Sequence, residues 1–439
     1  MRTGAATASP PAVVMNLFYT GLGIARSLGE QGIPVLGLTA KRGVYGNFTR
    51  YAKPIWSPDS REQPEELLAF LLRLGAGFER AAVIFPTRDD DVVFLDRFRT
   101  ELEPYFSMVI PGRAALSVCL SKMETHRAAE RAGVASPRCW MVEGTEDLKQ
   151  AVREVTYPCV LKPLSSHHWR KGANWQLVGA RKAIGIGSEQ ELLAEYDIVS
   201  RADRRAIVQE MVVGGDECLV IVACYFDRQS RWVAGFNTQK LAQVPEGFGT
   251  GCIVQSVDLH ELFGPTSRLL ESIGFKGIAE VEYKWDAAAG LYKLIEINPR
   301  PWDQHRLGNG CGVDLMYLAY RDHTGLPVDA GCKPRPGLLH QKWIAEDTFA
   351  STVLTLLWRR DPKLRVLIQQ ARGKRLYAIW SARDPLPLVV YVLVGLLPQV
   401  LAAGVRTIWS AITKGIRRCT SAREDRVYEN RLERRKTIG

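Results

Sequence analysis

The chain lacks the features of a secreted or redox-active protein. Its nine cysteines are scattered from Cys119 to Cys419, and no two of them form a CxxC pair. A chain of 439 residues, 46% of them hydrophobic, buries enough apolar surface to fold without disulfide bonds. The N-terminus also lacks a charged start followed by an uninterrupted apolar stretch and a small-residue cleavage site. We therefore expect reduced thiols and a multidomain globular protein of the cytoplasm.

The first 350 residues have almost no net charge, because the positive excess lies in the C-terminal part. The formal net charge is +11, and residues 351–439 contain 18 Lys and Arg against 6 Asp and Glu, which leaves 40 basic and 41 acidic residues before them. A basic segment of this kind binds either nucleic acid or an anionic membrane surface.

An uncharged run inside this segment favours the membrane over nucleic acid. Residues 386–405 are 20 residues without a charge, long enough to cross a bilayer. Pro387 and Pro398 interrupt the run and basic residues flank it, which also fits a helix pair lying among the headgroups. We expect contact with a membrane surface through residues 383–418, and a helical hairpin packed on the rest of the protein is the alternative.

The N-terminal part predicts a Rossmann-like α/β domain over residues 1–112. Residues 12–39 have the pattern of strand, helix and strand, and Gly32 ends the helix. Further strands are expected at 81–86 and 107–110, which completes an open parallel sheet.

The first turn of this domain has only part of a dinucleotide-binding fingerprint. Gly21 and Gly23 have the first spacing, in a turn expected over residues 19–23, but Arg26 stands where the third glycine belongs. No acidic residue lies about 20 residues further on. A nicotinamide cofactor is therefore disfavoured.

The remaining chain predicts two further parts. Residues 113–330 mix strands with isolated helices near 122–132 and 259–273, which indicates an α+β domain. Prolines close to residue 330 mark the next boundary. Residues 331–439 are expected to form a helical, basic and apolar extension.

Two lysines stand where a positive charge needs a partner. Ser121 and Glu124 form a capping box that places Lys122 in the first turn of a helix, where the helix dipole disfavours a cation unless an anion lies near. Lys162 ends the apolar strand YPCVLKP, where a charged side chain needs a partner. An exposed lysine is the alternative at each position.

A hinge-like segment follows further along the chain. The strand around Glu210 and Val212 precedes a Gly-Gly turn and Glu217, seven residues after Glu210. The backbone of an extended segment pairs with the edge of a base, and a carboxylate at this distance suits ribose hydroxyls. An ordinary strand and turn would have the same sequence.

The hairpin GIAEVEYKWD-AAAG-LYKLIEINPRP has the most specific pattern. Glu282 and Glu296 each lie seven residues from Ala289, so they face one another across the turn, and Asn298 shares the face of Glu296. Facing carboxylates repel one another, and oxygen ligands of this kind suit Mg²⁺ shared with nucleotide phosphates. A solvated acidic ladder is the alternative, which the apolar neighbours and the NPRP segment disfavour.

These motifs, in this order, resemble the ATP-grasp superfamily, which includes D-alanyl-D-alanine ligase, biotin carboxylase and carbamoyl phosphate synthetase. The resemblance covers roughly residues 10–327, and the opening GLGIARSLGEQGIPVLGL with FNTQKLAQVPEGFGTG is most similar to the D-aspartate ligase and predicted carboligase branch. It implies a Rossmann-like domain followed by a two-lobed ATP-grasp fold.

The resemblance also implies roles for single residues. Lys122 and Lys162 would hold the phosphates of ATP, Glu210 and Val212 would meet adenine, Glu217 would meet ribose, Glu282, Glu296 and Asn298 would bind one or two Mg²⁺ (or Mn²⁺), and Arg300 would face the transferred phosphoryl group. One departure from the family lies after Lys162, where LSSHHWRKGAN replaces a glycine-rich loop. Ser165, His168 or Lys171 would then cover the nucleotide.

Other polar residues are candidates for the chemistry. Lys240 lies in a glycine-rich segment that is able to close over a site and exclude water, or else in an exposed loop. Asp303, His305 and Arg306 follow the hairpin and are candidates for contacting the acceptor or an acyl phosphate, although a lone histidine such as His305 is more often structural.

Three consecutive aspartates, Asp89, Asp90 and Asp91, follow the strand at 81–86. They suit the binding of an amine, but a solvated helix start is the better interpretation, because acidic side chains favour the N-terminus of a helix.

The resemblance implies an ATP-dependent ligase that joins a small-molecule carboxylate to an amine through an acyl phosphate. A small-molecule kinase of the same fold and a non-catalytic nucleotide-binding scaffold at the membrane are the alternatives. We expect no nucleic-acid partner and a location at the inner face of the cell membrane.

Overall fold

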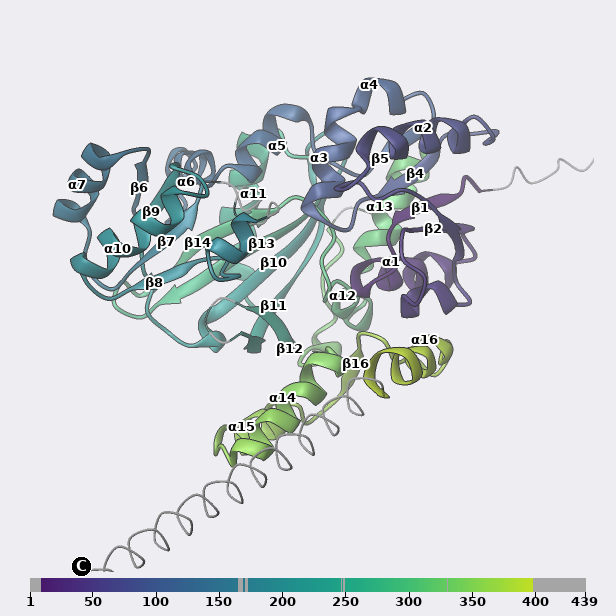
Figure 1. The fold of residues 1–439 in the computed structure, drawn as a ribbon. Coiled ribbons are helices and arrows are strands. Elements are labelled where there is room, and N and C mark those ends of the chain that lie inside the picture. Colours follow the sequence, from purple (N-terminus) through teal and green to yellow (C-terminus); the bar gives the residue numbers. More distant parts are fainter. Residues whose placement is uncertain are drawn as a thin grey trace, which may run out of the picture.

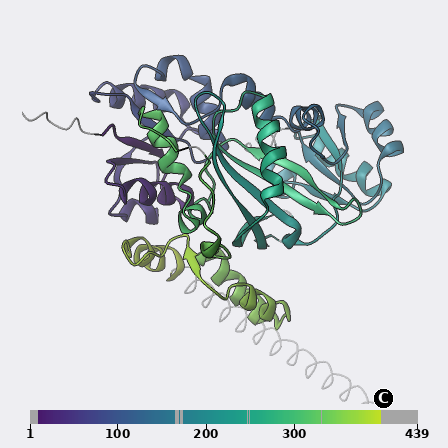
Figure 2. The ribbon, with the colours of Figure 1, turned by 180° about the vertical axis from the view of Figure 1, so that it is seen from behind.

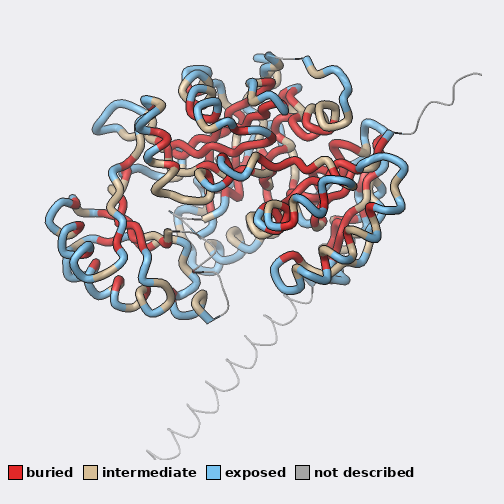
Figure 3. The backbone as a smooth tube through the Cα atoms, turned by 90° about the horizontal axis from the view of Figure 1, so that it is seen from above, coloured by how far each residue is buried: buried red, intermediate tan, exposed pale blue. Residues whose placement is uncertain are grey.

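The computed structural model describes residues 9–164, 169, 173–245, 247, 249–329 and 331–397. Three β-sheets organise these residues, with helices packed around them (Figure 1). Buried segments of the chain lie in the interior, and exposed segments surround them (Figure 3). The architecture is the α/β and α+β combination that the sequence predicts.

The N-terminal sheet is parallel, with the strand order β3-β2-β1-β4-β5. Its strands are β1 (Ala12–Met15), β2 (Val35–Thr39), β3 (Lys53–Trp56), β4 (Ala82–Phe85) and β5 (Phe106–Met108), and the helices beside it are α1 (Tyr19–Gly29), α2 (Pro64–Gly75), α3 (Asp89–Arg97) and α4 (Arg99–Leu102), with a 3-10 turn η1 at Tyr45–Phe48. Strands β1 and β4 are buried along their whole length. The order reverses between them, and a doubly wound sheet binds ligands at this kind of switch point.

The first helix corrects one sequence expectation. Residues 19–23, predicted as a turn, are the first turns of α1. A Cβ on Gly21 would lie 1.8 Å from the carbonyl oxygen of Asn16, and one on Gly23 would lie 2.6 Å from Nε2 of His305. Both glycines therefore let α1 approach its neighbours closely.

The second sheet is a small antiparallel one, with the order β6-β9-β7-β8. Helices α5 (Arg113–Leu120) and α6 (Lys122–Arg131) lead into it, its strands are β6 (Cys139–Val142), β7 (Cys159–Pro163), β8 (Ile184–Ile186) and β9 (Ala206–Glu210), and α7 (Thr145–Glu154), α9 (Asn174–Leu177) and α10 (Glu189–Ser200) accompany it. Helix α6 begins at the predicted position, and Oγ of Ser121 accepts the N–H of Glu124 at 3.4 Å.

The third sheet has seven strands in the order β14-β13-β10-β11-β12-β15-β16. They are β10 (Leu219–Phe226), β11 (Trp232–Val244), β12 (Thr250–Val257), β13 (Gly277–Asp286), β14 (Leu291–Asn298), β15 (Lys342–Ile344) and β16 (Arg375–Tyr377), and the helices of this part are α11 (Phe263–Ser272), α12 (Arg306–Cys311) and α13 (Leu315–His323), with 3-10 turns at Asp216–Cys218, His260–Leu262 and Pro336–Leu338. The seven-stranded sheet and the four-stranded sheet belong to the two lobes expected for the second part of the chain (Figure 2).

The C-terminal extension is not wholly helical, because it contributes two strands to this sheet. Strand β15 pairs with β12, and β16 pairs with β15. Its helices are α14 (Glu346–Arg359), α15 (Lys363–Gln370) and α16 (Leu386–Val390), which a π-helical turn continues over Tyr391–Leu396. The predicted domain boundaries after residues 112 and 330 stay predictions.

A buried ion pair fixes the extension to the N-terminal domain. Nε of Arg26 lies 2.9 Å from Oδ2 of Asp384, and both side chains are almost fully buried. Arg26 also donates to the carbonyl oxygen of Ile379 at 2.7 Å. The arginine that interrupts the glycine fingerprint therefore joins α1 to a segment more than 350 residues away.

The predicted apolar run over residues 386–405 lies only partly within the described residues. Among the helices that the structure describes, none combines the length and the apolar character needed to cross a bilayer.

Candidate functional site

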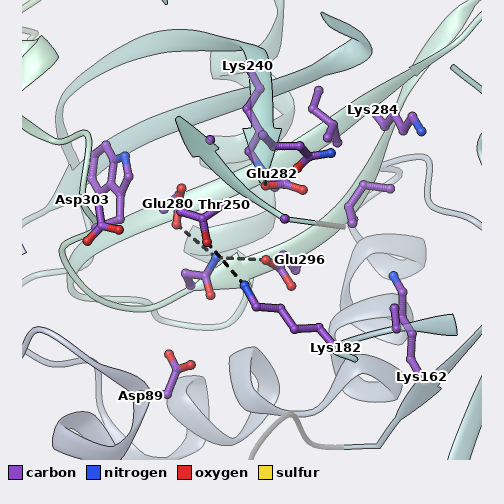
Figure 4. Close-up of a pocket in the computed structure, with 18 of the residues that line it drawn as sticks. Asp89, Lys162, Lys182, Lys240, Thr250, Glu280, Glu282, Lys284, Glu296 and Asp303 are labelled. Carbon is purple, nitrogen blue, oxygen red and sulfur yellow. Dashed lines mark hydrogen bonds and ion pairs between the residues drawn. The ribbon is translucent and has the colours of Figure 1, made fainter. Parts of the chain in front are cut away.

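A cavity of about 510 Å³ lies where the three sheets meet. Of the residues predicted from sequence, those that line it are Asp89, Asp90, Lys122, Lys162, Glu210, Val212, Lys240, Glu282, Glu296, Asn298, Arg300 and Asp303. Several of their side chains point toward one another from the two lobes (Figure 4). The sequence motifs, which are spread over almost 180 residues, therefore come together in one place.

The two hairpin carboxylates face one another as predicted. Glu282 is the register partner of Glu296, and Glu280 is that of Asn298. Nδ2 of Asn298 donates to Oε2 of Glu280 at 3.1 Å and to Oε1 of Glu296 at 3.2 Å. The amide thus joins the side chains of Glu280 and Glu296. We call the part of the cavity lining formed by these two residues, Glu282 and Asn298 the acidic floor.

Glu280 is a functional candidate that the sequence analysis missed. It lies two residues before Glu282, so strand alternation alone places it on the same face. Burial raises its pKa to about 8, although the positive charges of Arg300 and Lys240 act in the opposite direction. A carboxyl with this pKa is partly protonated near neutral pH.

The donor set fits a Mg²⁺ ion that is shared with a bound phosphate group. Two carboxylates and an amide oxygen are the hard oxygen ligands that Mg²⁺ prefers. Within the part of the chain that the structure describes, no three His, Cys, Asp or Glu side chains form a metal-binding group by themselves. Glu282, Glu296 and Asn298 are candidates to hold an ion together with oxygens from a ligand.

The structure corrects the predicted loop position of Lys240. It lies on β11, is buried, and its Nζ is 2.5 Å from Oε2 of Glu282. Burial acts to lower its pKa, but the charge of Glu282 outweighs that effect and raises it. A fixed ammonium thus already compensates one of the facing carboxylates.

A second group of lysines lies across the cavity from the acidic floor. Nζ of Lys162, at the end of β7, donates to Oε1 of Gln209 at 2.6 Å. Burial and the neighbouring charge of Lys122 lower the pKa of Lys162. Burial would raise the pKa of Glu296, but Lys122 and Lys162 lower it below its usual range. This field suits a polyanion that bridges the lysines and the acidic floor.

The predicted hinge lines the cavity through Glu210 and Val212. The carboxylate of Glu210 already accepts two hydrogen bonds. Oε1 of Glu210 accepts from Nζ of Lys293 at 3.0 Å, and Oε2 accepts from the backbone N–H of Arg138 at 3.1 Å. Val212 is buried beside it. Glu217 is exposed and outside the cavity lining, so the structure adds nothing to the ribose role predicted for it.

The far end of the cavity lies at the switch point of the N-terminal sheet. Nε of Arg300 donates to Oδ1 of Asp89 at 2.5 Å, and Oγ1 of Thr20 donates to Oδ1 of Asp303 at 2.6 Å. Burial acts to lower the pKa of Arg300, but the charge of Asp89 raises it. Burial raises the pKa of Asp303 despite its bond from Thr20.

The other two aspartates have separate structural roles. Asp91 is buried and accepts the backbone N–H groups of Thr87 and Arg88, each at 3.1 Å, which caps α3. Asp90 forms an ion pair with the exposed Arg61. The predicted helix start is thus correct, but it is not solvated as expected, because Asp91 is fully buried. Thr20, Thr87 and Arg88 are lining residues that the sequence analysis missed.

The remaining candidates lie elsewhere. Nε2 of His305 lies 3.1 Å from the carbonyl oxygen of Thr20, and burial lowers the pKa of its ring to about 4. Arg306 pairs with Glu30 at 3.3 Å outside the cavity, so a contact with the reacting groups is not supported for it. Ser165, His168 and Lys171 fall outside the described residues.

Comparison with known proteins finds distant relatives in sequence and in fold. No protein-family profile matches the chain. It is 23% identical to D-alanine–D-alanine ligase from Pseudomonas entomophila over 225 residues, which are 47% of this chain and 64% of that protein. It is 21% identical to D-aspartate ligase from Enterococcus faecium over 213 residues, 47% of this chain and 50% of that protein. The chain thus spans less than two thirds of either relative.

Solved structures with the same fold cover more of the chain. N5-carboxyaminoimidazole synthetase from Staphylococcus aureus superposes with a TM-score of 0.60 at 13% identity, covering 83% of this chain and 89% of that one. Biotin carboxylase from Campylobacter jejuni superposes with a TM-score of 0.57 at 17% identity, covering 75% and 73%.

Proposed function

We propose that this chain, which has the ATP-grasp fold, is an ATP-dependent ligase that joins a small-molecule carboxylate to an amine. An acyl phosphate would be the intermediate, and ADP and phosphate would be released. The observation that carries the proposal is that Glu282, Glu296 and Asn298 line the same cavity as Lys122 and Lys162.

The positive charges of the cavity match the needs of phosphoryl transfer. A carboxylate acylates amines poorly until its oxygen becomes a leaving group, and transfer of a phosphoryl group depends chiefly on positioning and on positive charge. Lys122 and Lys162 would hold the phosphates of ATP. Arg300, fixed by Asp89 at the opposite end, would contact the transferred group. Bound Mg²⁺ would neutralise part of the phosphate charge.

The hinge after β9 would hold the base of the nucleotide. Because Lys293 and the backbone of Arg138 already occupy the carboxylate of Glu210, the base would pair with the main chain near Val212 rather than with that side chain. Val212 would contribute an apolar surface to the ring.

The acceptor amine would enter at the switch point of the N-terminal sheet. Asp303 and Asp89 place carboxylates there, which attract an ammonium group. Because burial raises the pKa of Asp303, this carboxyl is suited to taking a proton from the amine before its attack. Asp89, at the start of α3, and Asp303, after β14, would thus hold the second substrate from two separate parts of the chain.

A screen for ADP release tests the proposed reaction. Purified full-length protein with ATP and Mg²⁺ is mixed with pairs of small carboxylates and amino acids. We expect release that needs both substrates. Glu296→Ala should lose the activity, and the exposed Glu101→Ala on α4 should retain it. Release with one substrate alone would favour a small-molecule kinase, and no release with any pair would favour a nucleotide-binding scaffold.

We also propose that the protein works at the inner face of the cell membrane. The basic C-terminal part and its apolar side chains support this location. Fractionation of cells that produce the tagged protein tests it, because the proposal requires a membrane-bound fraction that high salt reduces.

A further inference from the structure

Helix α14 has apolar side chains both on the face that packs against the protein and beyond that face. Phe349, Val353 and Leu356 pack against the core of the protein. Beyond that face, Leu354, Leu357 and Trp358 are 54%, 59% and 83% exposed. A surface helix normally presents polar residues to water, and an exposed tryptophan with two leucines beside it marks an interaction site.

The last described helical segment repeats this pattern. Leu388 and Tyr391 pack against the core, while Val389, Leu393 and Val394 are 47%, 58% and 58% exposed. Helices α14, α15 and α16 lie on the same side of the molecule in both ribbon views (Figures 1 and 2). We call the exposed apolar residues of α14 and residues 386–397 the C-terminal surface.

The charges around the C-terminal surface are mainly positive. From the start of α14 to the end of the described segment, residues 346–397 contain eight Lys and Arg and four acidic residues. Of the acidic residues, Glu346 accepts hydrogen bonds from the backbone N–H groups of Ile379 and Trp380, and Asp347 lies at the N-terminal end of α14, away from Trp358. Asp384 is buried in the pair with Arg26, so it contributes little negative charge to the outside. Arg359 and Arg360 directly follow Trp358, and Arg365 is also exposed. Cations next to exposed apolar groups suit an interface between water and anionic lipid.

A second copy of the chain is a poorer occupant. A two-fold dimer would bring the same patch of each copy together, so the arginines of one copy would face those of the other. An anionic bilayer instead accepts the apolar side chains and pairs with the positive ones.

We propose that the C-terminal surface binds an anionic bilayer from one side, with Leu354, Leu357 and Trp358 inserted at the boundary between headgroups and acyl chains. This inference rests on the proposed location at the membrane, but not on the proposed reaction. No residue after Gln304 lines the cavity within the described part of the chain, so binding and catalysis are separable by mutation.

Point variants test this better than deletion. Removing residues 381–439 would take away Asp384 and leave Arg26 buried without its partner, which destabilises the fold for a reason unrelated to lipid. The test therefore uses the full-length chain and sedimentation with vesicles of phosphatidylcholine alone or mixed with phosphatidylglycerol. We expect binding to the anionic vesicles that falls with added salt.

The apolar contribution is tested by the triple variant L354S/L357S/W358S. It should bind anionic vesicles at least about tenfold more weakly, because the three substitutions remove most of the apolar surface that would enter the bilayer. The matched control is L193S/L326S, whose side chains are 42% and 48% exposed on other elements, and it should bind like the wild type. Thermal unfolding and ADP release should be unchanged in all of these proteins.

The charge contribution is tested by R359Q/R365Q against the control R73Q/R153Q, in which exposed arginines of α2 and α7 are neutralised. Only R359Q/R365Q should weaken the binding to anionic vesicles, and this variant should also make the binding less dependent on salt. Wild-type protein that stays in the supernatant with anionic vesicles would overturn the proposal. So would equal losses in test and control variants, or a dimer in analytical ultracentrifugation that the triple variant abolishes.

Discussion

Replacing Asp384 with alanine should destabilise the protein strongly, because it isolates a buried positive charge. The side chains of Arg26 and Asp384 are 1% and 2% exposed, and removing one partner of such a pair costs about 3–5 kcal/mol. The carboxylate of Asp384 also accepts Oγ1 of Thr49 at 2.6 Å and the N–H of Arg50 at 3.0 Å. Losing these bonds moves the expected cost toward the upper end of that range.

Urea denaturation followed by circular dichroism measures this cost as a change in the free energy of unfolding. The double variant R26M/D384L should recover most of the loss, because an apolar pair of similar volume carries no isolated charge. Glu65→Ala is the matched control. It breaks an exposed pair with Arg97, whose two side chains are more than half exposed, and should cost less than about 1 kcal/mol.

The reasoning is refuted if Asp384→Ala costs no more than Glu65→Ala. It is also refuted if the double variant is less stable than the single one, because the isolated guanidinium would then not be the source of the cost.

Three further changes test the site and its surroundings. Glu296→Gln should weaken the binding of ADP in the presence of Mg²⁺ at least about tenfold, as measured by calorimetry with and without the metal. Equal affinities of the wild type and the variant for ADP with Mg²⁺ would contradict the metal role. Lys162→Met should weaken nucleotide binding by at least about tenfold, because it removes one charge-assisted hydrogen bond. The unfolding temperature should not fall, because burial already disfavours the charged form of this lysine and lowers its pKa. Burial lowers the pKa of His305 to about 4, below its usual value near 6.5, so the unfolded chain binds more protons between these values. Stability should therefore fall from pH 6.5 toward pH 4, by up to about 3 kcal/mol from this ring, and His305→Gln should show a smaller fall in urea midpoints over that range.

Local patterns in the sequence were sufficient for the hairpin of the site. Counting residues from Ala289 places Glu282 opposite Glu296, and the structure has this register. The capping residues around Lys122 predicted the start of α6 in the same way. Such features depend on the period of a strand or on the first turn of a helix, which a few neighbouring residues specify.

Other residues of the site could not be assigned from local patterns. Lys240 was expected in a loop because glycines surround it, but pairing with β10 and β12 makes its segment a strand. Thr20 and Arg88 line the cavity only because the end of the N-terminal sheet faces the hairpin. Glycine content is a weak guide to conformation when long-range strand pairing competes with it.

The sequence by itself therefore determined the order of the motifs, the facing carboxylates and the separation of a neutral core from a basic C-terminal part. These follow from composition and from short-range periodicity. Only the tertiary structure decided that Lys240 neutralises Glu282, that Arg26 holds Asp384, and that one face of α14 stays exposed. The two contacts join segments that are far apart in the chain, and the exposed face of α14 is a face that no such segment covers within the described residues. All three depend on how the sheets and helices pack rather than on any local pattern.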